Sequence, residues 1–173
     1  AGRVRRVTDT EALTERYWES SQRRFQTAPI PVDAGFAVET PKTAQPPWRV
    51  VYLGDARTEK GYQFLPDVAR AIAPRLAAGH VEMTLQSNFN LPGGETGIPE
   101  ARRALEAFPN VRVLTEPIAD AQYIQLMRDA HLLLLPYEAR RYAARSSGIL
   151  AEAVLAATPV VAPAGTWMSD QLL

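Results

Sequence analysis

The chain has 173 residues, of which 46% are apolar and 22% are charged, and these fractions are typical of a globular domain rather than of a disordered or fibrous chain. Its 19 basic and 19 acidic residues balance to zero formal charge, which argues against a nucleic-acid partner held by bulk charge. Because the sequence has no cysteine and two histidines, disulfides, zinc–thiolate sites and iron–sulfur clusters are excluded, and we expect no metal and no cofactor.

No apolar run approaches the roughly 18 residues that a membrane-spanning helix needs. The N-terminus is basic and then acidic, and it lacks the apolar segment of a signal peptide. We therefore expect a cytoplasmic protein without a transmembrane segment.

The first segment with a helical pattern is Thr8–Phe25. Thr8 and Glu11 have the spacing of a capping box, in which a hydroxyl and a carboxylate satisfy free N–H groups of the first turn. A proline-rich stretch with little periodicity follows. These patterns divide the chain into a helix left from or linking to an N-terminal domain, an interdomain linker and a main domain, at residues 1–27, 28–47 and 48–173.

From residue 48 onward, short apolar runs alternate with amphipathic segments. Strands are predicted at Arg49–Leu53, Val81–Leu85, Val111–Leu114, Leu132–Leu135 and Pro159–Ala162. Helices are predicted at Phe64–Ala78 with a kink at Pro74, and at Pro99–Phe108, Asp120–Ala130, Gly148–Ala157 and from Trp167 onward. This alternation predicts an α/β domain with a doubly wound, Rossmann-like parallel sheet. Because the sequence stops inside the last helix, we expect a domain truncated at its C-terminus.

Three signatures that this fold class could carry are absent from the sequence. These are the G-x-G-x-x-G turn, the G-x-x-x-x-G-K-[ST] loop and the G-x-S-x-G elbow. Their absence disfavours a dinucleotide-dependent dehydrogenase, a P-loop enzyme and an α/β-hydrolase.

The turn after the first predicted strand, GDARTEKG at residues 54–61, combines glycines with two cations. Arg57 and Lys60 precede a helix, where the helix dipole, free N–H groups and basic side chains all favour an anion. A solvated loop in which Asp55 and Glu59 pair with both cations fits the same sequence.

A second small-residue turn, RSSGILAEA at residues 145–153, follows the apolar run HLLLLP and opens a helix. Free N–H groups at such a helix start form a cradle for an anion. Glu152 lies one turn into the helix, where a carboxylate can accept hydrogen bonds from both hydroxyls of a ribose. The alternative is that Ser147 caps the helix and Glu152 is an ordinary exposed glutamate.

Together these segments resemble the C-terminal, donor-binding domain of GT-B glycosyltransferases, especially family-4 enzymes. The resemblance depends on the order and spacing of VVYLGDARTEKGYQFLPDVARAI, ADAQYIQLMRDAHLLLLPY and SSGILAEAVLAATPVVAPAG. PIPVD at residues 29–33 is similar to the segment that crosses between the two domains. The likeness runs from Pro29 to the end and implies the C-terminal half of a GT-B architecture, with an N-terminal domain as its missing partner.

The resemblance implies that Arg57 and Lys60 hold the donor diphosphate and that Glu152 contacts the nucleotide ribose. Backbone N–H groups at the second turn would face phosphate or sugar, and the loop after the third strand would meet the base. The candidate substrate-binding residues are therefore Arg57, Lys60, Gly61, Glu116, Arg145, Ser147, Gly148, Ile149, Leu150 and Glu152. No catalytic residue is assigned.

The sequence departs from the family pattern where the first of two glutamates is expected, because this position is Ala144. Tyr142 or Arg145 could act from the same loop. Two smaller departures are Arg57, three residues after the first glycine of its turn, and Ala157, where the family usually has glycine.

The implied activity is that of a bacterial-type hexosyltransferase, which moves a sugar from a nucleoside diphosphate sugar to an unidentified acceptor with retention of configuration. Because no Asp-x-Asp motif is present, we expect Arg57, Lys60 and helix N-termini, rather than a metal, to stabilise the leaving group. The isolated chain is expected to be inactive.

The alternatives are a non-catalytic nucleotide-binding or scaffold domain, which Ala144 motivates, and a nucleotide-sugar epimerase, whose catalytic acids and histidines the sequence hardly offers. We interpret His131 as structural, and Asn88 and Asn90 as residues that shape a long loop.

Overall fold

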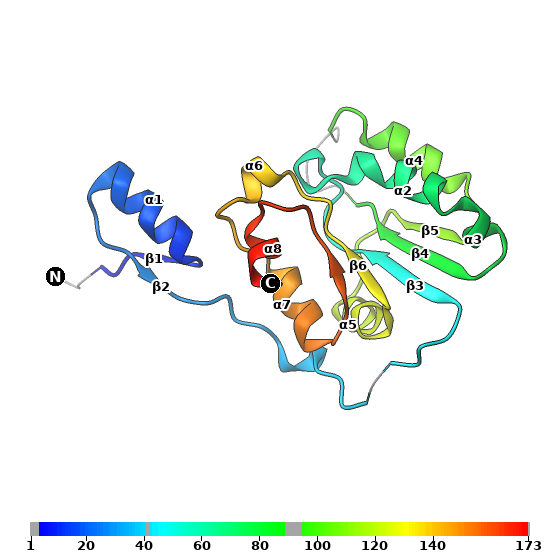
Figure 1. The fold of residues 1–173 in the computed structure, drawn as a ribbon, viewed down its shortest axis with the longest axis horizontal. Helices are drawn as coiled ribbons and strands as arrows, with labels where there is room; N and C mark the ends of the chain where they lie inside the picture. Colours follow the sequence, from blue (N-terminus) through cyan, green and yellow to red (C-terminus); the bar gives the residue numbers. More distant parts are fainter. Residues whose placement is uncertain (1–3, 41, 89–94, 173) are drawn as a thin grey trace.

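The computed structural model describes residues 4–40, 42–88 and 95–172 (Figure 1). Its main domain is built on a five-stranded sheet in which all neighbouring strands are parallel, in the order β5-β4-β3-β6-β7. The strands are β3 (Trp48–Tyr52), β4 (Val81–Gln86), β5 (Val111–Leu114), β6 (Leu132–Leu134) and β7 (Val160–Val161). The order confirms the predicted doubly wound α/β fold. Strands are added outward from β3 to β5 on one side and from β6 to β7 on the other, so the topological switch point lies between β3 and β6.

The sheet is covered on both faces because its central strands are apolar on both sides. Along β3, Val51 packs into a core with α5 (Asp120–Asp129) and α7 (Gly148–Leu155), whereas Val50 packs into a second core with α2 (Leu65–Ala71) and α4 (Ile98–Glu106). The alternation continues in β6, where Leu133 and Leu134 belong to opposite cores. Figure 1 shows the helices in these two layers.

The remaining helices of the main domain are short. They are α3 (Ala73–Ala77), α6 (Ala139–Tyr142) and α8 (Trp167–Gln171). The helix predicted over 64–78 is divided into α2 and α3 at Ile72, which has φ −110° and ψ 13°, because Pro74 has no N–H to continue the hydrogen-bond ladder. Among the described residues, no helix is long and apolar enough to cross a membrane.

A separate N-terminal unit consists of β1 (Val7–Thr8), α1 (Glu11–Ser21) and β2 (Gln26–Thr27), with β1 and β2 parallel. The helix begins later than expected, and its cap is Thr10, whose Oγ1 accepts a hydrogen bond from the Leu13 N–H at 3.1 Å. Thr8 cannot serve as the cap because it is extended and paired with Thr27. Figure 1 shows this unit lying to one side of the main sheet.

The segment between β2 and β3 packs partly against the main domain. Its short 3₁₀ helix, Ala34–Phe36, places Phe36 in the core between α5 and α7. The Phe36 ring meets the Tyr123 ring edge-on, with centroids 5.9 Å apart. This contact fixes the path of the chain on the same face of the sheet as α7.

Candidate functional site

A cavity of about 270 Å³ lies at the carboxyl ends of β3 and β6, where the strand order reverses and ligands of doubly wound sheets bind. Its walls include both turns that the sequence singled out. It is lined by Leu53, Gly54, Lys60, Tyr123, Tyr137, Tyr142, Ser146, Ser147, Gly148, Ile149 and Glu152.

Half of the candidate substrate-binding residues line this cavity, and half do not. Those that line it are Lys60, Ser147, Gly148, Ile149 and Glu152. Those outside it are Arg57, Gly61, Glu116, Arg145 and Leu150. The structure therefore brings one cation, one carboxylate and the start of α7 together around a single space.

Lys60 is the cation that faces the cavity. Its Nζ lies 5.9 Å from the centroid of the Tyr137 ring and forms no salt bridge with a described residue. Burial lowers the pKa of Lys60 from its usual value. Asp55 and Glu59 attract this ammonium, and a partly desolvated ammonium of this kind is well suited to meet an anion that enters the cavity.

Arg57 belongs to a different environment. It forms salt bridges with Asp55 at 2.9 Å and with Glu59 at 3.8 Å. The solvated-loop alternative, in which acidic neighbours pair with both cations of this turn, is therefore correct for Arg57 but not for Lys60. The diphosphate contact expected of Arg57 stays a prediction.

Glu59, which the sequence analysis did not propose as a site residue, gathers basic side chains from the loop after β6. Its carboxylate lies 3.3 Å from Arg141 and 3.7 Å from Arg145, and its side chain is 19% exposed. Arg145 is thereby held away from the cavity lining. This cluster could be found only from the structure, because more than eighty residues separate its members.

Gly61 has a structural reason for being glycine. Its φ is +72°, and a Cβ atom there would lie 1.9 Å from the carbonyl oxygen of Pro136. The backbone of the turn after β3 therefore contacts the segment after β6. The ligand contact expected of Gly61 stays a prediction.

Glu152 is partly buried and its carboxylate is hydrogen-bonded. Its Oε2 accepts a hydrogen bond from the Tyr123 hydroxyl at 2.6 Å, whereas Oε1 has no hydrogen-bond partner among the described residues. Burial and this bond raise the pKa of Tyr123, so the phenol remains a donor. The carboxylate is oriented by α5 and keeps one oxygen available to a ligand.

The start of α7 presents backbone donors to the cavity. Ser147 occupies the N-cap position, but its side chain does not cap the helix, contrary to one of the two alternatives. The Leu150 N–H bonds to the Ser147 carbonyl at 3.1 Å, and the buried Leu150 side chain belongs to the core. The N–H groups of Gly148 and Ile149 have no acceptor in the described part of the chain, so they are the free donors of this helix.

Three tyrosines complete the lining: Tyr123, Tyr137 and Tyr142. The sequence suggested Tyr142 as a residue that could act in place of the missing glutamate, and this role stays a prediction. The rings of Tyr137 and Tyr142 lie 4.5 Å apart and are tilted by 51°. Burial raises the pKa of both phenols, which keeps them as hydroxyl donors. Of the two tyrosines that the sequence did not suggest, only Tyr137 carried a usable signal, since it directly follows the apolar run before the second turn.

Other residues discussed from the sequence do not line this cavity. Glu116 is exposed after the edge strand β5, which β4 separates from β3, so its proposed role near the base stays a prediction. Asn88 is buried, and its Oδ1 has no hydrogen-bond partner among the described residues, whereas Asn90 lies outside them. His131 is held between the Arg49 N–H and the Thr43 carbonyl at 3.0 and 2.9 Å, which fits a structural role.

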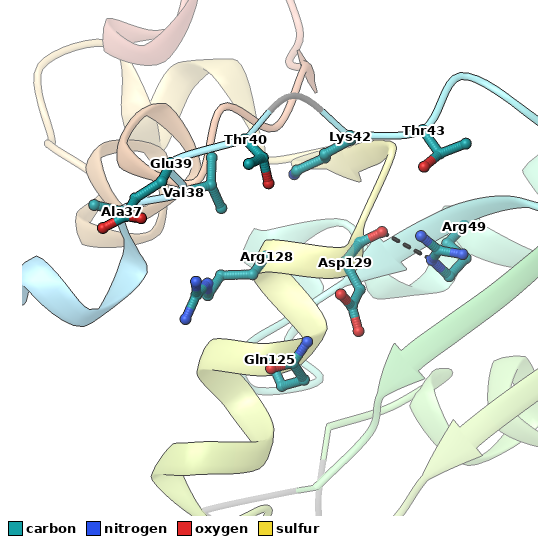
Figure 2. A pocket seen from close by; sticks show the side chains of 10 residues that line it. All are labelled: Ala37, Val38, Glu39, Thr40, Lys42, Thr43, Arg49, Gln125, Arg128 and Asp129. Carbon is teal, nitrogen blue, oxygen red and sulfur yellow. Dashed lines mark hydrogen bonds between the residues drawn. The ribbon is translucent and has the colours of Figure 1, made fainter.

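A second cavity, of about 480 Å³, lies at the opposite end of β3 (Figure 2). Its lining residues are Ala37, Val38, Glu39, Thr40, Lys42, Thr43, Arg49, Gln125, Arg128 and Asp129. Arg49 Nε donates to the Asp129 carbonyl at 2.8 Å, and Lys42 Nζ donates to the Ala130 carbonyl at 2.7 Å. Since these cations are occupied by the C-terminal end of α5, we assign the functional site to the cavity at the switch point.

Within the described ranges, no three His, Asp or Glu side chains gather as metal ligands would.

Comparison of the sequence with protein-family models and with curated proteins gave no match. Solved structures do resemble the chain. HepE from Anabaena in complex with UDP-glucose is 16% identical with a TM-score of 0.67, and the alignment covers 96% of this chain and 46% of HepE. Trehalose-6-phosphate synthase OtsA is 14% identical with a TM-score of 0.60, over 88% of this chain and 40% of OtsA. This chain therefore spans less than half the length of either protein.

A third similar structure is the C-terminal domain of LpcC, a glycosyl transferase group 1 family protein from Francisella tularensis. It is 13% identical with a TM-score of 0.59, and the alignment covers 79% of this chain and 73% of that domain. These likenesses show that the fold is that of GT-B glycosyltransferases and matches a C-terminal domain, as the sequence resemblance implied. A relationship to family 4 stays a prediction.

Proposed function

We propose that this chain is the donor-binding part of a glycosyltransferase that takes a sugar from a nucleoside diphosphate sugar. The proposal depends on one observation, the arrangement of Lys60, the free N–H groups of Gly148 and Ile149, and the carboxylate of Glu152 around one cavity. A cation and N–H donors recognise phosphate, whereas a carboxylate recognises the hydroxyl groups of a ribose. The fold shared with HepE, whose structure contains UDP-glucose, supports this class of ligand.

The same groups suit the chemistry of transfer. When the bond from the sugar to the diphosphate breaks, negative charge develops on the leaving phosphate. Lys60 and the start of α7 would stabilise this charge without reorganising, and their partial burial strengthens the attraction. We propose that the charge is met in this way without a metal, and that transfer retains the configuration, as the resemblance implies.

The cavity size limits what this chain can do by itself. At about 270 Å³ it lies below the roughly 300 to 1,000 Å³ of ordinary ligand pockets, so it can hold only part of a sugar nucleotide. The acceptor and the residues that would act on it therefore need a second wall. We propose that an N-terminal domain supplies this wall and that the chain alone transfers little or no sugar.

A non-catalytic nucleotide-binding domain is the second candidate. Arg57 is neutralised by two carboxylates, and the buried residue Ala144 provides no polar group at the loop before α7. Such a domain would bind nucleotide through Lys60 and Glu152 but would not promote sugar release.

Calorimetric titration with UDP, GDP, ADP and CMP tests the proposal. We expect one diphosphate to bind selectively and its affinity to fall at least about tenfold (~1.4 kcal/mol) in Lys60→Met and in Glu152→Gln. Asp67→Asn, an exposed change on α2, serves as the matched control and should bind as the parent does. Failure of the folded chain to bind any of these nucleotides would overturn the proposal.

A transfer assay separates the two candidates. It uses the longest form of the protein that carries this chain, together with the sugar ester of the nucleotide that binds. Release of free nucleotide that is lost in Glu152→Gln supports a transferase. Tight binding without release supports the non-catalytic domain.

A further inference from the structure

The N-terminal unit reaches the rim of the cavity. Thr10 Oγ1 donates to the Ala144 carbonyl at 2.7 Å, and Ser146 Oγ donates to Asp9 Oδ2. Both contacts join residues more than 130 positions apart, and Figure 1 shows the loop between α6 and α7 extending toward the turn between β1 and α1. A carboxylate from outside the main domain is thus fixed beside the loop that leads into α7.

Asp9 is related to the proposed ligand site through Ser146, whereas Asp9 itself lines a separate cavity with Val7 and Thr8. Its hydrogen-bond partner Ser146 is one of the residues that line the cavity. Asp9 is part-exposed, and its Oδ1 has no hydrogen-bond partner among the described residues. One oxygen therefore anchors the side chain to the rim, and the other remains able to accept a hydrogen bond.

Two other carboxylates near this loop are paired with arginines. Glu59 interacts with several arginines, and Glu138 lies 3.0 Å from Arg141. Asp9, by contrast, forms no salt bridge with a described residue. Like Glu152, which also lacks a salt bridge with a described residue, Asp9 is therefore a carboxylate near the cavity whose charge no described arginine balances.

The chemistry of the two sides of the cavity differs accordingly. Lys60 and the start of α7 attract phosphate, whereas an unpaired carboxylate repels phosphate and accepts hydrogen bonds from hydroxyl groups. A ligand that places its diphosphate near Lys60 and extends toward Ser146 would present its sugar hydroxyls to Asp9. The nucleotide part, by contrast, would remain with Glu152.

We propose that Asp9 is a specificity-determining residue that binds hydroxyl groups of the donor sugar from outside the main domain. The inference depends on the proposed function, since it assigns the sugar end of the same ligand. A purely structural tie would not need this carboxylate, because the Thr10 bond to a backbone carbonyl already attaches the unit to the loop.

Calorimetry that compares a free diphosphate with its sugar ester tests this inference. The probes are UDP against UDP-glucose, with the ADP and GDP pairs measured in parallel. In Asp9→Asn and Asp9→Ala we expect affinity for the sugar ester to fall about tenfold, and affinity for the free diphosphate to change less than about twofold. Glu11→Gln, an exposed change two residues away, should alter neither affinity.

A second variant separates recognition from docking of the N-terminal unit. Thr10→Val removes the bond to Ala144 but keeps Asp9, and it should change both affinities in parallel if it changes them at all. Equal losses of affinity for the diphosphate and its sugar ester in the Asp9 variants, or no loss for either, would overturn the proposed role of Asp9 but not the proposed function. Absence of any nucleotide binding by the parent chain would overturn the proposed function together with this inference.

Discussion

A Cβ atom on Gly61 would lie 1.9 Å from the carbonyl oxygen of Pro136, so the turn after β3 and the segment after β6 are in backbone contact. Each of these two segments contributes a lining residue to the candidate site. Lys60 immediately precedes the contact on one side, and Tyr137 immediately follows it on the other. The two segments are therefore held together at a position where no side chain can be accommodated.

Gly61→Ala should destabilise the protein by at least about 2 kcal/mol, because a left-handed backbone costs about 1 kcal/mol in alanine and the clash displaces a buried segment. Urea unfolding measures the loss. Gly79→Ala is the matched control, since Gly79 has φ +69° but nothing within 4 Å of its added Cβ, and it should lose only about 1 kcal/mol. Equal losses in the two variants would show that the contact with Pro136 is unimportant.

Lys60 and Arg57 should differ in their contribution to diphosphate binding, although they lie three residues apart. Lys60→Met should weaken binding at least about tenfold, because Lys60 lines the cavity without a salt bridge to a described residue. Arg57→Met should weaken it no more than about threefold, because Asp55 and Glu59 already balance that charge. Calorimetric titration decides, and similar losses in both variants would restore the sequence prediction that the two cations act together.

The fold could be predicted because its signal is local. The strand Val111–Leu114 lies where predicted, and no end of the other four strands is displaced by more than one residue, since buried parallel strands appear as short apolar runs. The four-residue helix α6 was missed because it contains two arginines and too few residues for a periodic pattern. The cap of α1 was placed at Thr8 rather than Thr10 because pairing of Thr8 with β2 cannot be recognised from the N-terminal sequence alone.

The site could be predicted only as far as it is built from single turns. Lys60 and Glu152 were found because each follows a strand and a small-residue turn. The partners of these turns come from distant positions: Tyr123 lies 29 residues from Glu152, and Asp9 lies 137 residues from Ser146. Only the folded chain shows that one carboxylate is oriented by a phenol and that another arrives from the N-terminal unit.

The hydrogen bond between Tyr123 and Glu152 should be measurable as a coupling energy. Tyr123→Phe removes the donor and leaves a part-buried carboxylate without it, which should cost about 1 to 2 kcal/mol of unfolding free energy. A double-mutant cycle with Glu152→Ala, which removes the acceptor, followed by urea unfolding, isolates the pair and should give a coupling of about 1 kcal/mol. Additive effects of the two changes would mean that the bond contributes nothing to stability.

Lys42 should make stability depend on alkaline pH. Burial lowers the pKa of Lys42 from 10.5 to about 8, and its ammonium donates to the Ala130 carbonyl at the end of α5. Between these two values the unfolded chain holds more protons than the folded chain, so this residue makes the free energy of unfolding rise as the pH increases from about 8 to about 10.5. Below that window both states are protonated, and the full cost of burying the charge is present.

Lys42→Met removes this titration and should flatten the pH dependence. The difference in unfolding free energy between the parent and Lys42→Met should therefore shift by roughly 1 kcal/mol in favour of the parent between pH 7.5 and pH 10. This shift is smaller than the full change in pKa would give, because the side chain is only partly buried and solvent screens its charge. Urea unfolding at the two pH values measures the shift. Arg128→Met removes another cation that lines the same cavity, and its difference from the parent should stay constant. Parallel pH profiles for the parent and Lys42→Met would contradict the lowered pKa and would indicate that the Lys42 ammonium is well solvated.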